Sequence, residues 1–126
     1  MTSLLVVDDD KILTMILEAK LAGTSVDVIS TFNANEALKI ICSSIRPDLI
    51  LLDLNMPKVS GLDLLETIKS NPESQNIPVI IISSSKNPEK IERALKLGAL
   101  DIINKPIDST ELHEKVFSVL QQEQNS

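Results

Sequence analysis

Acidic, hydroxyl and basic side chains follow the short apolar runs of this sequence, and their types suit phosphoryl chemistry. Asp8-Asp9-Asp10 follows the first run, and Asp53 follows the third. Ser83 follows the fourth run, and Lys105 lies two residues beyond the fifth. Carboxylates placed side by side repel one another unless a cation compensates them. Lys105 supplies one positive charge, and a divalent cation held by oxygen ligands would supply the rest. Few carboxylates, completed by water and phosphate, favour Mg²⁺.

A carboxylate beside Mg²⁺ and a lysine can attack a phosphoryl group and form an acyl phosphate. Such a transfer depends on positioning and charge neutralisation more than on acid–base chemistry. We therefore predict Asp53 as the nucleophile, and the Ser83 hydroxyl and Lys105 ammonium as groups that bind phosphoryl oxygens. The predicted metal ligands are Asp8, Asp9, Asp53 and the backbone carbonyl of Asn55.

Each of these residues also has an ordinary structural interpretation. Acidic residues suit the start of a helix, and we expect Asp10 to be a helix cap. Asp53 alone could equally be a turn former, so its spacing leaves both interpretations open, and only the joint placement indicates a site. Hydrolases of the haloacid-dehalogenase type carry Asp-x-Asp, whereas the sequence here is Asp53-Leu54-Asn55. Because an amide cannot shuttle the proton, this class is disfavoured.

The apolar runs and the segments between them predict the elements that position these residues. The runs are continuous and rich in β-branched residues, as is typical of parallel strands buried on both faces. They are Leu4–Val7, Val26–Ile29, Leu49–Leu52, Ile77–Ile82 and Leu100–Ile103. Amphipathic segments alternate with them at 11–21, 34–43, 62–69 and 88–97, and a last helix follows Asp108. This alternation predicts an α/β fold: a flavodoxin-like, doubly wound, five-stranded parallel sheet of order 2-1-3-4-5 with five helices.

The length and composition narrow the class of protein. A chain of 126 residues is expected to form a single domain, with a core from about 3 to 120 and a polar tail over 121–126. The net charge of −6 argues against nucleic acid and against an anionic membrane surface. Cys42 is the only cysteine and is expected to be buried. This cysteine usage, together with apolar runs too short to span a bilayer, predicts a cytoplasmic protein. His113 is expected at the surface.

The chain resembles the receiver domains of response regulators in two-component signalling, of the stand-alone chemotaxis-regulator type. The motifs that carry this resemblance are Val6–Asp10, Leu51–Pro57, Gly61, Ile82–Ser84 and Asn104–Pro106. The resemblance implies that Asp53 accepts a phosphoryl group from a phosphohistidine on a sensor histidine kinase or a phosphotransfer protein. It implies Mg²⁺ as the cofactor, a cis Lys105–Pro106 bond, and no catalysis beyond the protein's own phosphorylation and dephosphorylation.

The resemblance also implies how the signal leaves the domain. The family signals through the face formed by the fourth helix, the fifth strand and the fifth helix. Where many members carry an aromatic residue that takes part in switching, this chain has Ile102. With no effector domain expected, output would pass through contacts with an unknown protein target. Two alternatives remain open: a non-phosphorylated interaction module on the same fold, and an intermediate or phosphate sink in a phosphorelay.

Overall fold

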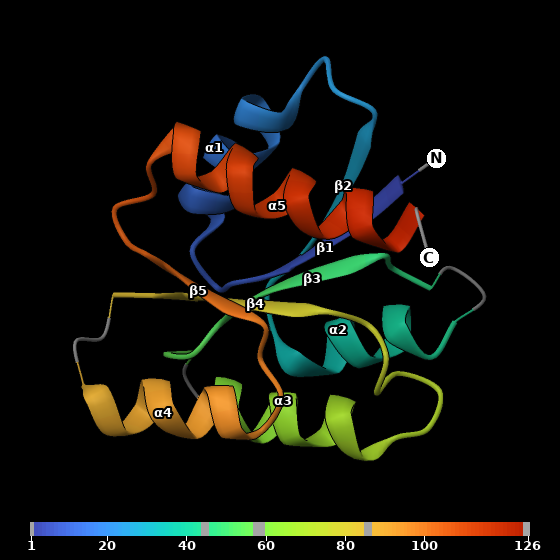
Figure 1. The fold of residues 1–126 in the computed structure, drawn as a ribbon, viewed down its shortest axis with the longest axis vertical. Helices are drawn as coiled ribbons and strands as arrows, with labels where there is room; N and C mark the ends of the chain where they lie inside the picture. Colours follow the sequence, from blue (N-terminus) through green and yellow to red (C-terminus); the bar gives the residue numbers. More distant parts are fainter. Residues whose placement is uncertain (1, 44–45, 57–59, 85–86, 125–126) are drawn as a thin grey trace.

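The computed structural model describes residues 2–43, 46–56, 60–84 and 87–124. Pro57, which belongs to one of the motifs above, and positions 125–126 of the predicted tail lie outside these ranges. Strands and helices alternate along the chain (Figure 1). The strands are β1 (Thr2–Val7), β2 (Val26–Thr31), β3 (Leu49–Asp53), β4 (Val79–Ser83) and β5 (Asp101–Asn104). The helices are α1 (Lys11–Leu21), α2 (Ala34–Ile41), α3 (Gly61–Ser70), α4 (Pro88–Lys96) and α5 (Ser109–Gln124).

The strands form one parallel sheet in the order β2-β1-β3-β4-β5, which confirms the predicted topology. β1 lies between β2 and β3, so the direction of winding reverses at β1 and β3. Beyond the carboxyl ends of these two strands lies the crevice in which doubly wound folds bind their ligands.

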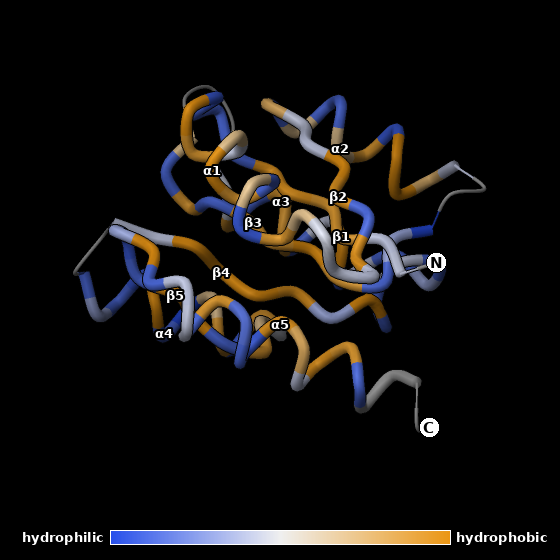
Figure 2. The backbone as a smooth tube through the Cα atoms, turned by 90° about the horizontal axis from the view of Figure 1, so that it is seen from above, coloured by the Kyte–Doolittle hydropathy of each residue, from blue (hydrophilic) through white to orange (hydrophobic). Residues whose placement is uncertain are grey.

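Helices cover both faces of the sheet and divide the core into two layers. The apolar side chains of α1 and α5 pack on one face, and those of α2, α3 and α4 pack on the other (Figure 1). Successive strand residues point to opposite faces. Leu4 and Val6 therefore belong to the first layer, whereas Leu5 and Val7 belong to the second. Figure 2 shows that the central strands consist largely of hydrophobic residues, as burial on both faces requires.

Side-chain caps fix where the helices begin. Asp10 caps α1 by accepting hydrogen bonds from the amides of Ile12 and Leu13, as its sequence position predicted. Asn33, Asn87 and Asp108 cap α2, α4 and α5 in the same way. Each cap satisfies amides that have no partner within their own helix. α1 therefore starts directly after the acidic cluster and holds that loop in place.

Several sequence expectations need correction. α5 continues to Gln124, so most of the predicted tail is helical, as suits its good helix formers glutamine and glutamate. Cys42 is exposed, because it is the C-cap residue of α2 rather than part of its packed face. His113 is half-buried, and its ring nitrogen Nε2 lies 2.9 Å from the carbonyl oxygen of Lys20. β4 begins at Val79, after Pro78, because proline has no amide to donate to a strand ladder.

In the described part of the chain, none of the helices has the length and apolarity to cross a membrane.

Candidate functional site

The predicted site residues stand at one edge of the sheet. Asp8 directly follows β1, Asp53 ends β3, Ser83 ends β4, and Lys105 directly follows β5. The carboxyl ends of parallel strands all lie at the same edge of a sheet. Asp53 is in register with Ile82, so Ser83 stands one residue further along the neighbouring strand.

Three carboxylates converge at this edge. One carboxylate oxygen from each of Asp8, Asp9 and Asp53 lies within 4.8 Å of the other two. Asp8 is fully buried and Asp53 is 3% exposed, whereas Asp9 is exposed. The cluster is therefore open to solvent through Asp9 and closed at its base, so a small cation entering past Asp9 would meet the two buried carboxylates.

Lys105 is the cation of this cluster. Its Nζ lies 3.0 Å from Oδ2 of Asp8 and 3.7 Å from Oδ1 of Asp53. The peptide bond between Lys105 and Pro106 is cis, which confirms the prediction made from the family resemblance. One ammonium group faces three carboxylates, so the cluster keeps a deficit of positive charge.

Backbone amides hold the two buried carboxylates in place. The amide of Asp10 donates to Oδ1 of Asp8 at 2.9 Å, and the amide of Asn55 donates to Oδ1 of Asp53 at 3.1 Å. Among the described residues, Oδ2 of Asp8 has no hydrogen-bond partner. Its contact with Lys105 brings opposite charges together but lacks hydrogen-bond geometry. A fully buried carboxylate oxygen in this condition suits a metal ligand.

The surroundings of Asp53 raise the pKa of its carboxyl group above the ordinary value of 3.8. Burial is the largest cause, because it penalises the charged form. The hydrogen bond from Asn55 lowers the pKa, the charge of Asp8 raises it, the charge of Lys105 lowers it, and the charge of Asp9 raises it. The folded protein therefore holds Asp53 in a place where its negative charge needs a further cation.

The donor set fits Mg²⁺. It consists of carboxylate oxygens that lie close together, with one member exposed so that bound water can be retained. Asn55 is exposed, and its backbone amide contacts the carboxylate of Asp53. Three of the four metal ligands predicted from the sequence, Asp8, Asp9 and Asp53, thus lie together in the structure.

Sequence reasoning missed the part that Gly61 has in this site. The amide of Gly61, the first residue of α3, donates to the carbonyl of Leu54 at 3.1 Å. A Cβ at position 61 would lie 2.2 Å from the carbonyl oxygen of Asp53 and 2.6 Å from Cα of Leu54. The start of α3 therefore lies against the backbone of Asp53. The only signal for Gly61 in the sequence was its place among the motifs that carry the family resemblance.

The raised pKa of Asp53 leads to a prediction about stability. In metal-free buffer at neutral pH, we expect Asp53→Asn to raise the free energy of unfolding by roughly 1 kcal/mol or more. The folded state binds the Asp53 proton more tightly than the unfolded state, so wild-type stability falls as pH rises from 3.8 through the raised pKa. The side-chain amide of the Asp53→Asn variant does not titrate. Its gain in stability over wild type should therefore vanish below the pKa that Asp53 has in the unfolded state.

Urea unfolding between pH 3.5 and 7.5 would measure this difference. Asp27→Asn is the matched control, because Asp27 is exposed and its substitution should change stability within about 0.5 kcal/mol. A difference between Asp53→Asn and wild type that stays constant with pH would contradict the prediction.

Comparison with known proteins agrees with this architecture. Residues 4–117 match the family model of the response regulator receiver domain. The Regulator of RpoS from Escherichia coli (strain K12) is 31% identical over 118 residues, or 93% of this chain. The receiver domain of the Francisella response regulator 1452 superposes with a TM-score of 0.87 at 30% identity, covering 98% of this chain and 99% of that one. For a putative response regulator from Chloroflexus aurantiacus J-10-fl, the TM-score is 0.87 at 27% identity, covering 95% and 98% of the two chains.

The chain belongs to the response regulator receiver domain family. It is a receiver domain of a response regulator, and this family is a phosphoacceptor signalling module that binds Mg²⁺ at an acidic pocket. Its members interact with histidine kinases or phosphotransfer proteins and with downstream targets. The chain spans about a third of the length of the Regulator of RpoS, at 34%.

Proposed function

We propose that Asp53 of this receiver domain accepts a phosphoryl group from a phosphohistidine in a Mg²⁺-dependent reaction. The observation that carries the proposal is the placement of a buried, amide-positioned carboxylate within 4.8 Å of two others and 3.7 Å from the Lys105 ammonium. The proposed metal ligands are Asp8, Asp9, Asp53 and the carbonyl of Asn55. When bound, Mg²⁺ would neutralise charge on the carboxylates and on the phosphoryl oxygens.

The transfer step needs only groups of this chain and the donor. An oxygen of Asp53 forms a bond to phosphorus while the bond from phosphorus to the donor's imidazole nitrogen breaks. That nitrogen keeps the electron pair, and an acyl phosphate remains on Asp53. The hydrogen bond from Asn55 to Oδ1 orients the carboxylate, and the other oxygen is left to attack. Lys105 and the Ser83 hydroxyl are proposed to bind the phosphoryl oxygens.

The proposal extends to partners and organisation. The phosphodonor is a sensor histidine kinase or a histidine phosphotransfer protein. We propose that residues 1–126 form a single receiver domain and that output passes through contacts of α4, β5 and α5 with a protein target. No catalysis beyond the chain's own phosphorylation and dephosphorylation is proposed. The cytoplasmic location and the lack of a nucleic-acid partner, both expected from the sequence, stay predictions.

Intact mass spectrometry tests the chemistry directly. The protein is incubated with a small-molecule phosphodonor, with and without Mg²⁺, as wild type and as Asp53→Asn. Wild type should gain one phosphoryl group in Mg²⁺, and removing either Mg²⁺ or the Asp53 carboxylate should reduce labelling at least about 100-fold, because both act in the same step. Asp63→Asn, at an exposed carboxylate on α3, is the control and should label as wild type does.

Two outcomes would overturn the proposal. Labelling that persists in Asp53→Asn would place the acceptor elsewhere. A folded wild type that stays unlabelled by both the small donor and a phosphohistidine donor would favour the non-phosphorylated interaction module. Labelling that transfers onward to a second histidine would identify the domain as an intermediate in a phosphorelay.

A further inference from the structure

β5 ends the sheet, with β4 on one side and an open edge on the other. Its sequence is Asp-Ile-Ile-Asn, and the preceding Leu100 is 53% exposed. An edge strand rich in β-branched residues is a template for pairing with another strand, because it presents unpaired backbone amides and carbonyls. The open edge of β5 is therefore a place where another strand could pair unless side chains block it.

The backbone groups of Ile102 face this open edge. The amide of Lys105 donates to Ser83 of β4 at 3.0 Å, and successive residues of a strand direct their backbone groups to opposite sides. Ile102 lies an odd number of residues before Lys105, and the side chain of Lys115 on α5 reaches its carbonyl, so we infer that its backbone groups lie on the side away from β4. Both groups are already engaged by side chains. The amide donates to Oδ1 of Asp101 at 2.8 Å, and the carbonyl accepts from Nζ of Lys115 at 2.6 Å.

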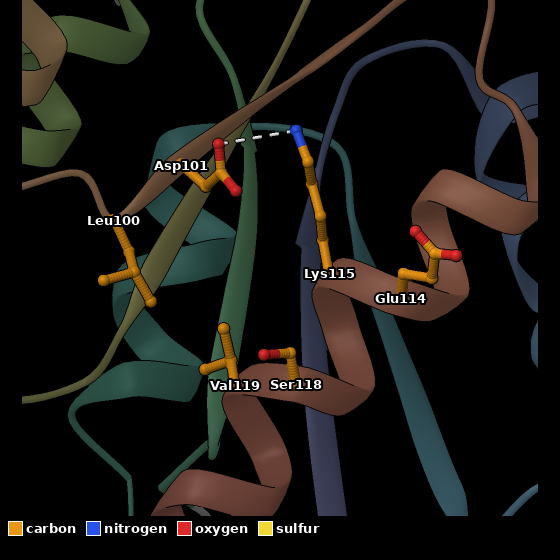
Figure 3. A pocket seen from close by; sticks show the side chains of 6 residues that line it. All are labelled: Leu100, Asp101, Glu114, Lys115, Ser118 and Val119. Carbon is orange, nitrogen blue, oxygen red and sulfur yellow. Dashed lines mark hydrogen bonds and ion pairs between the residues drawn. The ribbon is translucent and has the colours of Figure 1, made fainter.

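Asp101 and Lys115, which we call the β5 clasp, also contact one another. Nζ of Lys115 lies 3.4 Å from Oδ1 of Asp101 and 3.2 Å from Oε1 of Glu111. Figure 3 shows Lys115 reaching from α5 to Asp101 across the mouth of a recess of about 300 Å³. Its other lining residues are Leu100, Glu114, Ser118 and Val119. The clasp therefore links α5 to β5 and covers the strand edge at its centre.

The strand that best fits this edge is the same strand from a second copy of the chain. An antiparallel pair centred on Ile102 would make the two Ile102 residues exchange both backbone hydrogen bonds. Asp101 would then lie opposite Ile103, and Leu100 opposite Asn104, so no like charges would face each other. Such pairing needs the same two backbone groups that the clasp occupies. Clasp and partner strand are mutually exclusive.

We propose that the β5 clasp keeps the domain monomeric by closing the edge of β5 to a second copy of the chain. The clasp supplies one acceptor and one charged donor to Ile102, and the long side chain of Lys115 blocks the approach of another backbone. This role concerns the strand edge rather than the acidic cluster, so it does not depend on phosphorylation of Asp53.

Sedimentation equilibrium of the unphosphorylated full chain tests the proposal. Wild type should stay monomeric over the concentration range used. The double variant Asp101→Ala/Lys115→Met should form dimers with an association constant at least about tenfold higher than that of wild type. The matched control is Glu92→Ala/Lys96→Met, which removes the same kinds of charge from the exposed ion pair of Glu92 and Lys96. That control should stay monomeric.

Amide hydrogen exchange at Ile102 identifies the surface involved. In the clasp variant, the Ile102 amide should exchange at least about tenfold faster than in wild type at low protein concentration and regain protection on dimerisation. The conservative single variant Lys115→Arg keeps a charged donor, so it should stay monomeric as wild type does. A folded clasp variant that stays monomeric, a dimer whose Ile102 amide stays unprotected, or a wild type that associates equally would each overturn the proposal.

Discussion

Replacing Gly61 with alanine is expected to lower the free energy of unfolding by about 3 kcal/mol or more, above the usual cost of a single substitution. The new Cβ would lie 2.2 Å from the carbonyl oxygen of Asp53 and 2.6 Å from Cα of Leu54. Both contacts are with backbone, which cannot rotate away as a flexible side chain can. Either α3 must move or the end of β3 must distort, and both elements pack in the same core layer.

Two control variants separate this clash from other effects of glycine and of the helix start. Gly23→Ala places a Cβ in open space at a φ of +82°, so it should cost only about 1 kcal/mol of backbone strain. Ser60→Ala removes the α3 cap, which accepts from the amide of Leu62, and should cost about 1 kcal/mol. Urea unfolding followed by circular dichroism would rank the variants. A Gly61→Ala cost no larger than those of the controls would contradict the close approach of α3 to β3.

The same substitution should also slow phosphoryl labelling. The displaced carbonyl belongs to Asp53 itself, so relief of the clash would shift the carboxylate relative to Lys105 and to Asp8. A misplacement of about 1 Å can cost on the order of 100-fold in rate. Labelling of Gly61→Ala, measured at a temperature where the variant is folded, should therefore fall well below that of Ser60→Ala. Equal labelling of the two variants would mean that Gly61 affects stability alone.

The sheet and the position of the acidic cluster were predictable because they follow from pattern and topology. Continuous apolar runs alternating with amphipathic segments lead to a doubly wound parallel sheet, and such a sheet gathers the ends of its strands at one edge. Asp8, Asp53, Ser83 and Lys105 each follow a run, so topology alone placed them near one another. The helix cap at Asp10 was predictable for a similar reason, since capping depends on residues only a few positions apart.

Features that depend on distances between elements were not predictable. The sequence marks Gly61 as a glycine but does not say that α3 starts against the backbone of Asp53. The bond from Lys115 to Ile102 joins α5 to the edge of β5, and only the spacing of Glu111 and Lys115 on one helix hinted at an ion pair. Cys42 was expected to be buried on α2, but that helix ends at Ile41, and boundaries depend on local competition that patterns resolve poorly.

Replacing Lys105 with methionine is expected to cost roughly 2 kcal/mol of stability at neutral pH. The substitution keeps most of the length of the side chain and removes the charge that lies 3.0 Å from Asp8 and 3.7 Å from Asp53. Removing one partner of a buried ion pair costs about 3–5 kcal/mol, and the partial exposure of the Lys105 side chain, 22%, reduces this value. Lys96→Met is the control, because its pair with Glu92 is exposed and should contribute less than about 0.5 kcal/mol.

The pH dependence of this loss would show whether Lys105 acts by compensating carboxylate charge. The charge of Lys105 lowers the pKa of Asp53, so removing it raises that pKa further. A higher folded-state pKa of Asp53 means that stability is lost as pH rises, so the deficit of Lys105→Met should be larger at neutral pH than near pH 4. Urea unfolding of both lysine variants across this range would measure it. A deficit that is equal at both pH values would show that the loss does not arise from the charge of Asp53.

A double-mutant cycle separates the contribution of Asp53 from that of Asp8. In an Asp53→Asn background, only Asp8 and the exposed Asp9 would still need compensation, so Lys105→Met should cost about 1 kcal/mol less than in wild type. Because Asp8 is fully buried and closer to the ammonium, a substantial cost should remain in that background. Complete loss of the cost would assign the compensation to Asp53 alone. An unchanged cost would mean that Lys105 stabilises the fold through Asp8 and leaves the charge of Asp53 to be balanced by the metal ion.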